Sequence, residues 1–369
     1  MKKLLSLIFI ASVITTLGYT EACAQSVVYE AYSVLGVDEF NERLDSETRE
    51  ISGEISSDGL YDAEGALKKL LNKLVSDARE AIRDNISSVV GLIGISLLTS
   101  CASCFVSDKT SQSYINIAGV CAAAYMLTGG MEGLVEQSMQ ALLKIEDYSR
   151  AAIPAVFTAA VTCGAVVSAS SKYAAVTIAI DVLMGLAQSV LIPLVYAYLA
   201  LALSSAVFDN AILSSCKRAV KWICGTSLTV FTMVFSAFMG ISGLVSGTAD
   251  ALAVKTARTV ISTTLPVVGG IISDAASTVL TAATMIKNSA GVMSLIAVCT
   301  MCAGPFVLLS IKMLMYKVTA AVCEMLPNLR LSVFIKDVGT ALGMLMGLLG
   351  CSAIMLFISF MAAIKVVTI

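Results

Sequence analysis

Long apolar runs with few charges make up the sequence from Ile86 onward. A run of about 20 apolar residues is the length of a helix that crosses the hydrocarbon core of a bilayer. The chain is 57% hydrophobic and 14% charged, whereas soluble domains carry about 25% charged residues. We therefore expect an all-α polytopic membrane protein with about seven to eight transmembrane or re-entrant helices. The candidate spans are 86–106, 114–131, 150–170, 174–208, 222–245, 291–315 and 338–364.

Two segments precede these runs. Residues 1–24 have a Lys2-Lys3 start, an apolar centre and an Ala22-Cys23-Ala24 cleavage pattern, which predicts a signal peptide. Residues 25–85 are rich in acidic side chains and end in an amphipathic helical pattern, so we expect a short extracytoplasmic helical segment. Its apolar stripe has three uses open to it: packing on the membrane domain, lying on lipid, or binding a partner. Residues 86–369 would form the multi-span helical membrane domain.

The run 174–208 is too long for one straight span, and Pro193 lies inside it. It could form a helical hairpin or a kinked long helix. Positive charges favour the cytoplasmic side, and with the N-terminus outside, both Lys172 and the Lys217–Lys221 cluster would then lie inside. That placement needs an even number of crossings, which favours the hairpin. The same rule places 246–290 and the C-terminus outside.

The stretch 247–291 differs from its surroundings because charges interrupt it. Proline and paired glycines at 266–270 predict a break between two short helical pieces. The second piece carries five polar residues spaced three and four apart, which places them on one helical face. We expect pore-lining or partner-docking roles here, for Asp250, Lys255, Arg258, Pro266, Gly269, Asp274, Ser277, Thr281, Thr284, Lys287 and Asn288.

Two structures for 247–291 stay open at this point. One is an extramembrane amphipathic hairpin on the bilayer surface. The other is a re-entrant or pore-facing element, of the kind seen in transporters with interrupted helices. A broken helix with a polar face is tolerated at membrane depth only where protein or water surrounds it.

Two further features concern the spans themselves. Asp181 is an acid inside an apolar run, and it could bind a cation or proton or pair with a neighbour. Gly339, Gly343 and Gly347 follow a four-residue interval in the last run, which lets helices pack closely. Packing within the chain is the commoner use of such glycines, and assembly with other membrane proteins is the second.

Several classes of function are disfavoured by what the sequence lacks. It contains no histidine and no G-x-x-x-x-G-K-[ST] phosphate loop, so histidine-based catalysis and nucleotide hydrolysis by this chain are not expected. The net charge of −2 argues against a nucleic-acid partner. The pairs Cys101/Cys104 and Cys299/Cys302 could hold a metal, but small apolar packing is the better interpretation. We expect no enzyme, no metal and no cofactor.

The stretch 247–291 also carries a resemblance. Its pattern includes Thr248-Ala249-Asp250, Thr256-Ala257-Arg258, Leu265 to Gly269, Ser273-Asp274-Ala275 and Lys287-Asn288 before Gly291. This pattern resembles the stage III sporulation protein AE family of endospore-forming bacteria. The similarity extends toward the C-terminus, and the order of signal, short soluble segment and many spans agrees over the whole length.

The resemblance implies a membrane component of a secretion or channel complex that links mother cell and forespore. Partners would include a secretion-type ATPase, ring-forming components and the lipid bilayer. The location would be the mother-cell membrane around the forespore. A different hypothesis is a stand-alone secondary transporter, with Asp181 and the polar stripe as its site. An intramembrane enzyme is a third, and it would have to use carboxylates or lysines.

Overall fold

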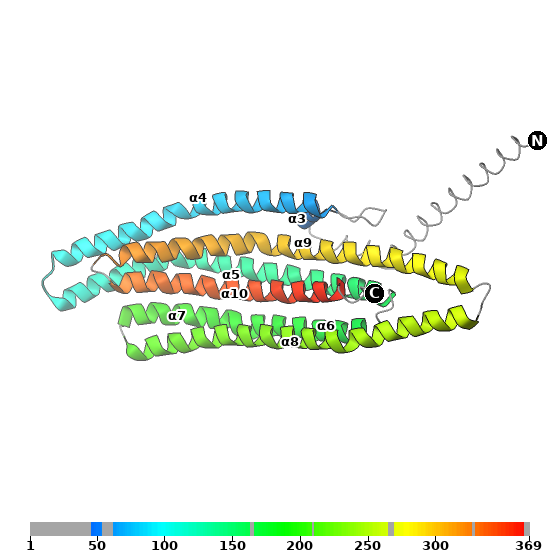
Figure 1. The fold of residues 1–369 in the computed structure, drawn as a ribbon. Coiled ribbons are helices and arrows are strands. Elements are labelled where there is room, and N and C mark those ends of the chain that lie inside the picture. Colours follow the sequence, from blue (N-terminus) through cyan, green and yellow to red (C-terminus); the bar gives the residue numbers. More distant parts are fainter. Residues whose placement is uncertain are drawn as a thin grey trace, which may run out of the picture.

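The computed structural model describes residues 46–53, 62–162, 166–208, 210–264, 269–326 and 329–364, and within 242–287 it describes the backbone alone. Long helices run side by side along one axis, and the chain reverses direction from one to the next, except that α6 and α7 continue in the same direction (Figure 1). The short helix α3 (Ser46–Ser52) precedes α4 (Ala63–Cys104), α5 (Lys109–Thr162), α6 (Val166–Leu186), the π-helical turn η1 (Ala187–Leu191), α7 (Ile192–Phe208), α8 (Ala211–Thr264), α9 (Gly269–Cys323) and α10 (Leu329–Ile364).

The fold class is confirmed at the level of an all-helical chain with membrane-spanning character. Six helices in the described part are long and apolar enough to cross a membrane, fewer than the seven to eight expected. They lie in Ala63–Cys104, Lys109–Thr158, Ala169–Phe208, Ala211–Ile241, Asn288–Cys323 and Arg330–Ile364. The expected signal peptide at 1–24 lies outside the described residues.

Local polar contacts explain where several helices begin. The Asp62 carboxylate accepts a hydrogen bond from the Gly65 amide at 2.9 Å, and Asp108 accepts one from the Ser111 amide at 3.1 Å. At the start of α8, Oδ1 of Asn210 accepts from the amide of Ile212 at 2.8 Å. Each side chain satisfies a backbone donor that has no partner within the first helical turn. The sequence thus marks three helix starts without any tertiary contact.

The expected hairpin at 174–208 is wrong. α6, η1 and α7 form one continuous helical path, and its π-helical turn lies directly before Pro193. A proline lacks an amide hydrogen and crowds the preceding turn, and a local π-helical turn is a common way to absorb that defect without breaking the helix. The alternative of an irregular long helix is therefore the correct one.

The predicted spans 114–131 and 150–170 are not separate helices in the structure. α5 runs unbroken through the polar stretch 132–150, and the chain reverses between Thr162 and Val166. A helix satisfies its own backbone, so polar side chains need not interrupt it. Lys172, near the start of the continuous α6–α7 path, therefore lies at the other end of the bundle from the Lys217–Lys221 cluster near the start of α8, which contradicts the expected placement of both on one side.

The two short helical pieces expected in 247–291 belong to much longer helices. α8 ends at Thr264 and α9 begins at Gly269. The chain thus reverses at the position where proline and glycine predict a break in the helix. Pro266 itself lies outside the described residues. The stretch is therefore the meeting point of two helices of 54 and 55 residues.

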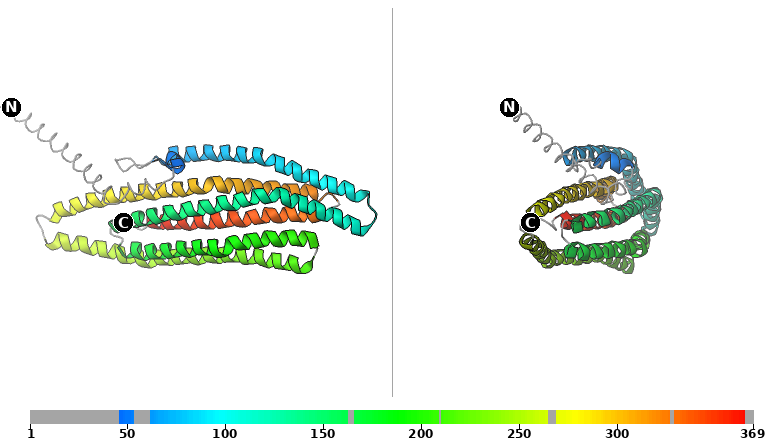
Figure 2. Two further views of the ribbon diagram at one scale, coloured as in Figure 1. Left: turned by 180° about the vertical axis from the view of Figure 1, so that it is seen from behind. Right: turned by 90° about the vertical axis from the view of Figure 1, so that its right-hand side faces the viewer.

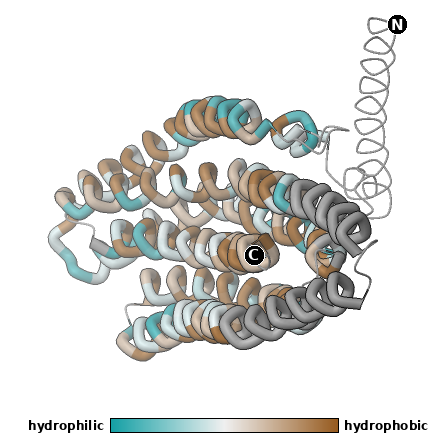
Figure 3. Tube along the Cα trace, turned by 45° about the vertical axis from the view of Figure 1, so that its right-hand side comes forward, coloured by the Kyte–Doolittle hydropathy of each residue, from teal (hydrophilic) through white to brown (hydrophobic). Residues whose placement is uncertain are grey.

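α10 occupies the centre of the bundle. It contacts α5, α7, α8 and α9, and it supplies many of the fully buried side chains, among them Leu342, Leu345 and Phe360. Figure 2 shows α10 between α5 and α9 on one side and α7 and α8 on the other, and part of its surface stays open between α8 and α9. The C-terminal part of α10 is hydrophobic, whereas hydrophilic residues recur along α4 (Figure 3).

Candidate functional site: a polar wall and a buried ion pair

The charged half of α4 lies beside an apolar segment of α9. A Cβ atom placed on Gly304 of α9 would lie 3.8 Å from Oδ2 of Asp77 on α4. Nearby, Leu70 and Leu74 of α4 pack with Ala303 and Cys299. This part of α9 falls inside the candidate span Asn288–Cys323. The charged half of α4 therefore lies beside a helix that is long and apolar enough to cross a membrane.

A cavity of about 470 Å³ opens between α3, α4, α5 and α9 at this level. Three carboxylates enter it from one face of α4, because Asp77, Glu80 and Asp84 are spaced three and four residues apart. Amides and a lysine of α5 line the opposite side. We call this the α4–α5–α9 cavity, and its polar lining comprises Thr48, Lys73, Asp77, Glu80, Asp84, Gln137, Gln140, Lys144 and Thr300.

Pro305 interrupts the hydrogen-bond ladder of α9 where that helix lines the cavity. Proline has no amide hydrogen, so it cannot donate to the carbonyl of Met301 one turn earlier. Met301, Gly304 and Pro305 all line the same cavity. The backbone of α9 thus adds an acceptor to a site that already holds acidic, basic and amide side chains. Such a lining can hold water, ions or a polar solute.

The opposite side of the bundle is apolar at the same height. A Cβ on Gly347 of α10 would lie 3.7 Å from Cδ1 of Leu228 on α8, and one on Gly350 would lie 3.8 Å from Phe306, two residues after Gly304. The large exposed side chains of α8 near this level are hydrophobic: Val230, Met233, Val234 and Phe238. The bundle therefore has a lipid-compatible face on α8 and a charged face on α4 and α5 at one depth. We call the charged face the polar wall.

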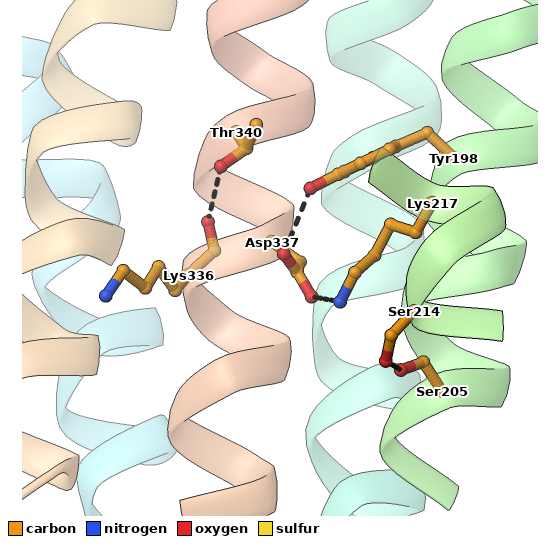
Figure 4. Close-up of polar contacts among 7 residues, drawn as sticks. All are labelled: Tyr198, Ser205, Ser214, Lys217, Lys336, Asp337 and Thr340. Atoms are coloured by element: carbon orange, nitrogen blue, oxygen red, sulfur yellow. Dashed lines mark hydrogen bonds and ion pairs between the residues drawn. The ribbon is translucent and has the colours of Figure 1, made fainter. Parts of the chain in front are cut away.

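A second polar group is buried among α7, α8 and α10. Lys217 donates a hydrogen bond to Oδ2 of Asp337, and the hydroxyl of Tyr198 donates to Oδ1 of the same carboxylate at 3.0 Å (Figure 4). The Lys217 and Asp337 side chains are 11% and 14% exposed. One positive and one negative charge face each other, so the group is neutral as a whole. Removing one partner would leave an uncompensated buried charge.

This buried group lies near the end of the bundle where α7 ends and α8 and α10 begin. Figure 4 shows a further contact close by, between the hydroxyls of Ser205 and Ser214 at 3.0 Å. Basic residues collect at this end, on α8, α9 and α10: Lys217, Arg218, Lys221, Lys317, Arg330 and Lys336. We call it the basic end. The positive-inside rule predicts that it faces the cytoplasm.

The residues predicted at 247–291 are divided by the structure. Asp250, Lys255 and Arg258 belong to α8, whereas Gly269 begins α9, which also carries Asp274, Ser277, Thr281, Thr284, Lys287 and Asn288. Their side chains lie outside the description, with the exception of Asn288, which is exposed. The backbone places the two sets on neighbouring helices that meet at one end of the bundle. Their proposed pore-lining or docking role stays a prediction.

Asp181 has a basic neighbour. Its Oδ1 lies 3.5 Å from Nη2 of Arg150, which also binds Glu146 at 2.7 Å. The Asp181 side chain is 55% exposed. Of the two uses left open for this acid, the geometry favours pairing with a neighbour.

The three glycines of the last helix do not share one environment. Gly339 is buried, and a Cβ there would lie 3.6 Å from the backbone carbonyl of Met313 on α9. Gly347 is exposed, and Gly343 is intermediate. Close helix packing thus involves Gly339 and also Gly343, where a Cβ would lie 3.3 Å from Sδ of Met313, whereas Gly347 borders open space on the surface of α10.

The cysteine pairs also differ. Cys101 and Cys104 are exposed, whereas Cys302 is buried and Cys299 is partly buried. Within the part of the chain that the structure describes, no three His, Cys, Asp or Glu side chains are grouped for a metal.

Sequence reasoning missed both the polar wall and the buried ion pair. The sequence places the α4 charges in a short helical segment without naming their neighbours, and it marks Lys217 only as a cytoplasmic charge; the extracytoplasmic location of residues 25–85 stays a prediction. A usable signal was present for Asp337, because it is the last charge before the long charge-free run of α10.

These features define the class of protein: an all-helical, multi-pass membrane protein whose bundle carries a charged face on α4 and α5. The sequence pattern of the family described as Stage III sporulation protein AE matches residues 47–367, and the chain belongs to this family. The Stage III sporulation protein AE of Bacillus subtilis (strain 168) is 21% identical over 190 residues, which cover 52% of this chain and 48% of that protein. The match thus spans about half the length of that curated relative. No solved structure matches.

Proposed function

We propose that this chain is the multi-pass membrane component of a sporulation-specific secretion or channel complex between mother cell and forespore. The family assignment supports a role in sporulation. The polar wall carries the finer proposal, because charged side chains at membrane depth are stable only against water or protein. In an assembly, the α4–α5 faces of several copies or partners would enclose a water-filled path, while α8 faces lipid.

The proposal assigns no covalent chemistry to the chain. Its polar residues would line or shape a path, and the energy for transport would come from a partner, because the sequence contains no phosphate loop. A secretion-type ATPase and ring-forming components of the same sporulation stage are the proposed partners. The proposed location is the mother-cell membrane around the forespore.

Cysteine accessibility tests the polar wall directly. In a cysteine-depleted chain, Glu80→Cys, Gln137→Cys and Gln140→Cys place thiols on the polar wall, and Val230→Cys and Val234→Cys place thiols on α8 as matched controls at a similar depth. A membrane-impermeant maleimide added to sporulating cells should label the first set and leave the second unlabelled. Labelling of the first set should also change when the ATPase partner is deleted.

Two outcomes contradict the proposal. If the α4 and α5 positions stay unlabelled while assembly is intact, the polar wall is covered by protein and lines no path. If both sets label equally, the bundle is not embedded as inferred.

A further inference from the structure

An apolar groove of about 760 Å³ runs along the surface between α8 and α9, with α10 as its floor. Gly343, Gly347 and Gly350 form the floor, since they carry no side chain to fill the space. The walls are largely apolar, with Leu228 and Met233 on one side and Phe306 and Met313 on the other. We call this the glycine groove.

One end of the glycine groove is basic. Lys221 of α8 and Lys317 of α9 line it on either side, near Thr340 of α10. Both lysines are exposed, and among the described residues neither forms an ion pair. Trp222 is 68% exposed beside Lys221, and tryptophan is enriched where a membrane meets water. A basic mouth beside an exposed tryptophan is typical of helix segments at the level of lipid headgroups.

The length of the groove along α10 matches the thickness of one leaflet. From Thr340 to Ile354, the rise of α10 is about 21 Å at 1.5 Å per residue. One leaflet has about 15 Å of hydrocarbon and several ångströms of headgroup region. A partner transmembrane helix would need contact across both leaflets, and one turn of such a helix already fills about 400 Å³. The dimensions favour an acyl chain over a helix.

We propose that the glycine groove binds one anionic phospholipid of the leaflet at the basic end. The phosphate and any further negative headgroup charge would bind Lys221 and Lys317, and an acyl chain would lie on Gly343, Gly347 and Gly350. Basic pockets between transmembrane helices on the cytoplasmic side bind anionic headgroups through the same combination of charge and shape. The bound lipid would fill the gap between α8 and α9. This inference does not depend on the proposed channel role.

The single tryptophan of the chain provides the measurement. The full-length chain is reconstituted in phosphatidylcholine vesicles that contain either brominated phosphatidylcholine or brominated phosphatidylglycerol at equal mole fraction. Bromine quenches tryptophan at short range, and Trp222 lies in a hollow that shares Lys221, Gly225 and Thr229 with the glycine groove. We expect stronger quenching by the anionic lipid, which corresponds to an enrichment of about fivefold for each lysine.

Matched variants separate the groove from general surface charge. Lys221→Gln with Lys317→Gln should abolish the preference, whereas Lys109→Gln with Lys336→Gln removes equal charge near the same end and should preserve it. Gly347→Leu fills the floor, since the nearest atom to a Cβ there is Cδ1 of Leu228 at 3.7 Å. This variant should weaken the preference although both lysines remain. Circular dichroism and a monodisperse elution profile check that each variant is folded.

Equal quenching by the two brominated lipids in the unaltered chain would overturn the proposal. An equal loss of the preference for anionic lipid in the two double-lysine variants would also overturn it, because that result indicates general attraction to a charged surface. A Gly347→Cys variant tests for a protein partner in the groove. If it cross-links to a second copy or another chain, and the unaltered chain shows no lipid preference, the groove is a protein interface and the proposal is overturned.

Discussion

Lys217 and Asp337 form a buried ion pair although 120 residues separate them in the sequence. The pair joins α8 to α10, and Tyr198 ties α7 to the same carboxylate. Three helices are thus fixed relative to one another at the basic end. The contact is one of the few specific polar links in an otherwise apolar interface, and it defines how these helices meet.

The buried pair should be sensitive to loss of either partner. Lys217→Met or Asp337→Asn is expected to lower the free energy of unfolding by about 3–5 kcal/mol, because the remaining charge is left uncompensated. The double variant should lose less than the sum of the two single losses. Thermal unfolding of the purified chain in detergent measures this coupling.

The exposed pair Lys336–Glu324, 3.4 Å apart, serves as the control. Its removal should change stability by less than about 1 kcal/mol. If Lys217→Met has no larger effect than Lys336→Gln, the buried pair does not hold the helices together.

The glycines of α10 should respond differently to a large side chain. Gly339→Leu forces a bulky group toward the Met313 carbonyl of α9, and we expect a loss of about 1–3 kcal/mol from overpacking. Gly347→Leu enters the open glycine groove and should cost less than 1 kcal/mol, by the same argument. Melting temperatures of the two variants test the difference. Similar losses at both positions would contradict the distinct environments described for them.

Asp108 should make the start of α5 sensitive to acid. Hydrogen bonds from the Ser111 amide, the Ser111 hydroxyl and the Thr110 amide lower the pKa of this carboxyl below its ordinary value of 3.8. A lowered pKa means that the stabilisation is fully present above pH 3.8 and is lost as the pH falls through the folded-state value. Amide exchange at Ser111 should therefore accelerate below that range.

An Asp108→Ala variant provides the reference for that pH dependence. It lacks the titrating group, so its Ser111 amide should exchange faster at neutral pH and show no further acid-dependent step. Asp108→Asn keeps an acceptor and should give intermediate protection. A persistent acid step in Asp108→Ala would assign it to another group.

Asp181 distinguishes the channel component from a stand-alone transporter. The acid is exposed and paired with Arg150, so Asp181→Asn should change stability by less than about 1 kcal/mol. Under the proposed function, sporulation efficiency should also be unaffected within about twofold, because an exposed pair of this kind adds little free energy. Substrate uptake by liposomes containing this chain alone, abolished by Asp181→Asn, would instead favour the transporter hypothesis.

The sequence by itself determined which segments are helical and apolar. Charge-free runs longer than 18 residues leave few structures other than membrane-spanning helices, because the backbone must satisfy itself in lipid. Asp62, Asp108 and Asn210 mark helix starts through contacts a few residues away. The pattern at 247–291 also allowed the resemblance to the family before any fold was known. All of these signals are local.

The tertiary structure alone decided how the segments meet. The polar stretch 132–150 reads as a connection in the sequence, yet α5 continues through it, and Gln137, Gln140 and Lys144 of this stretch line the α4–α5–α9 cavity. The run around Pro193 reads as a hairpin, yet a π-helical turn keeps it continuous. Whether a charge is buried against a partner, as in Lys217 and Asp337, depends on helices brought together across the chain. Neither residue type nor spacing along one helix encodes that pairing.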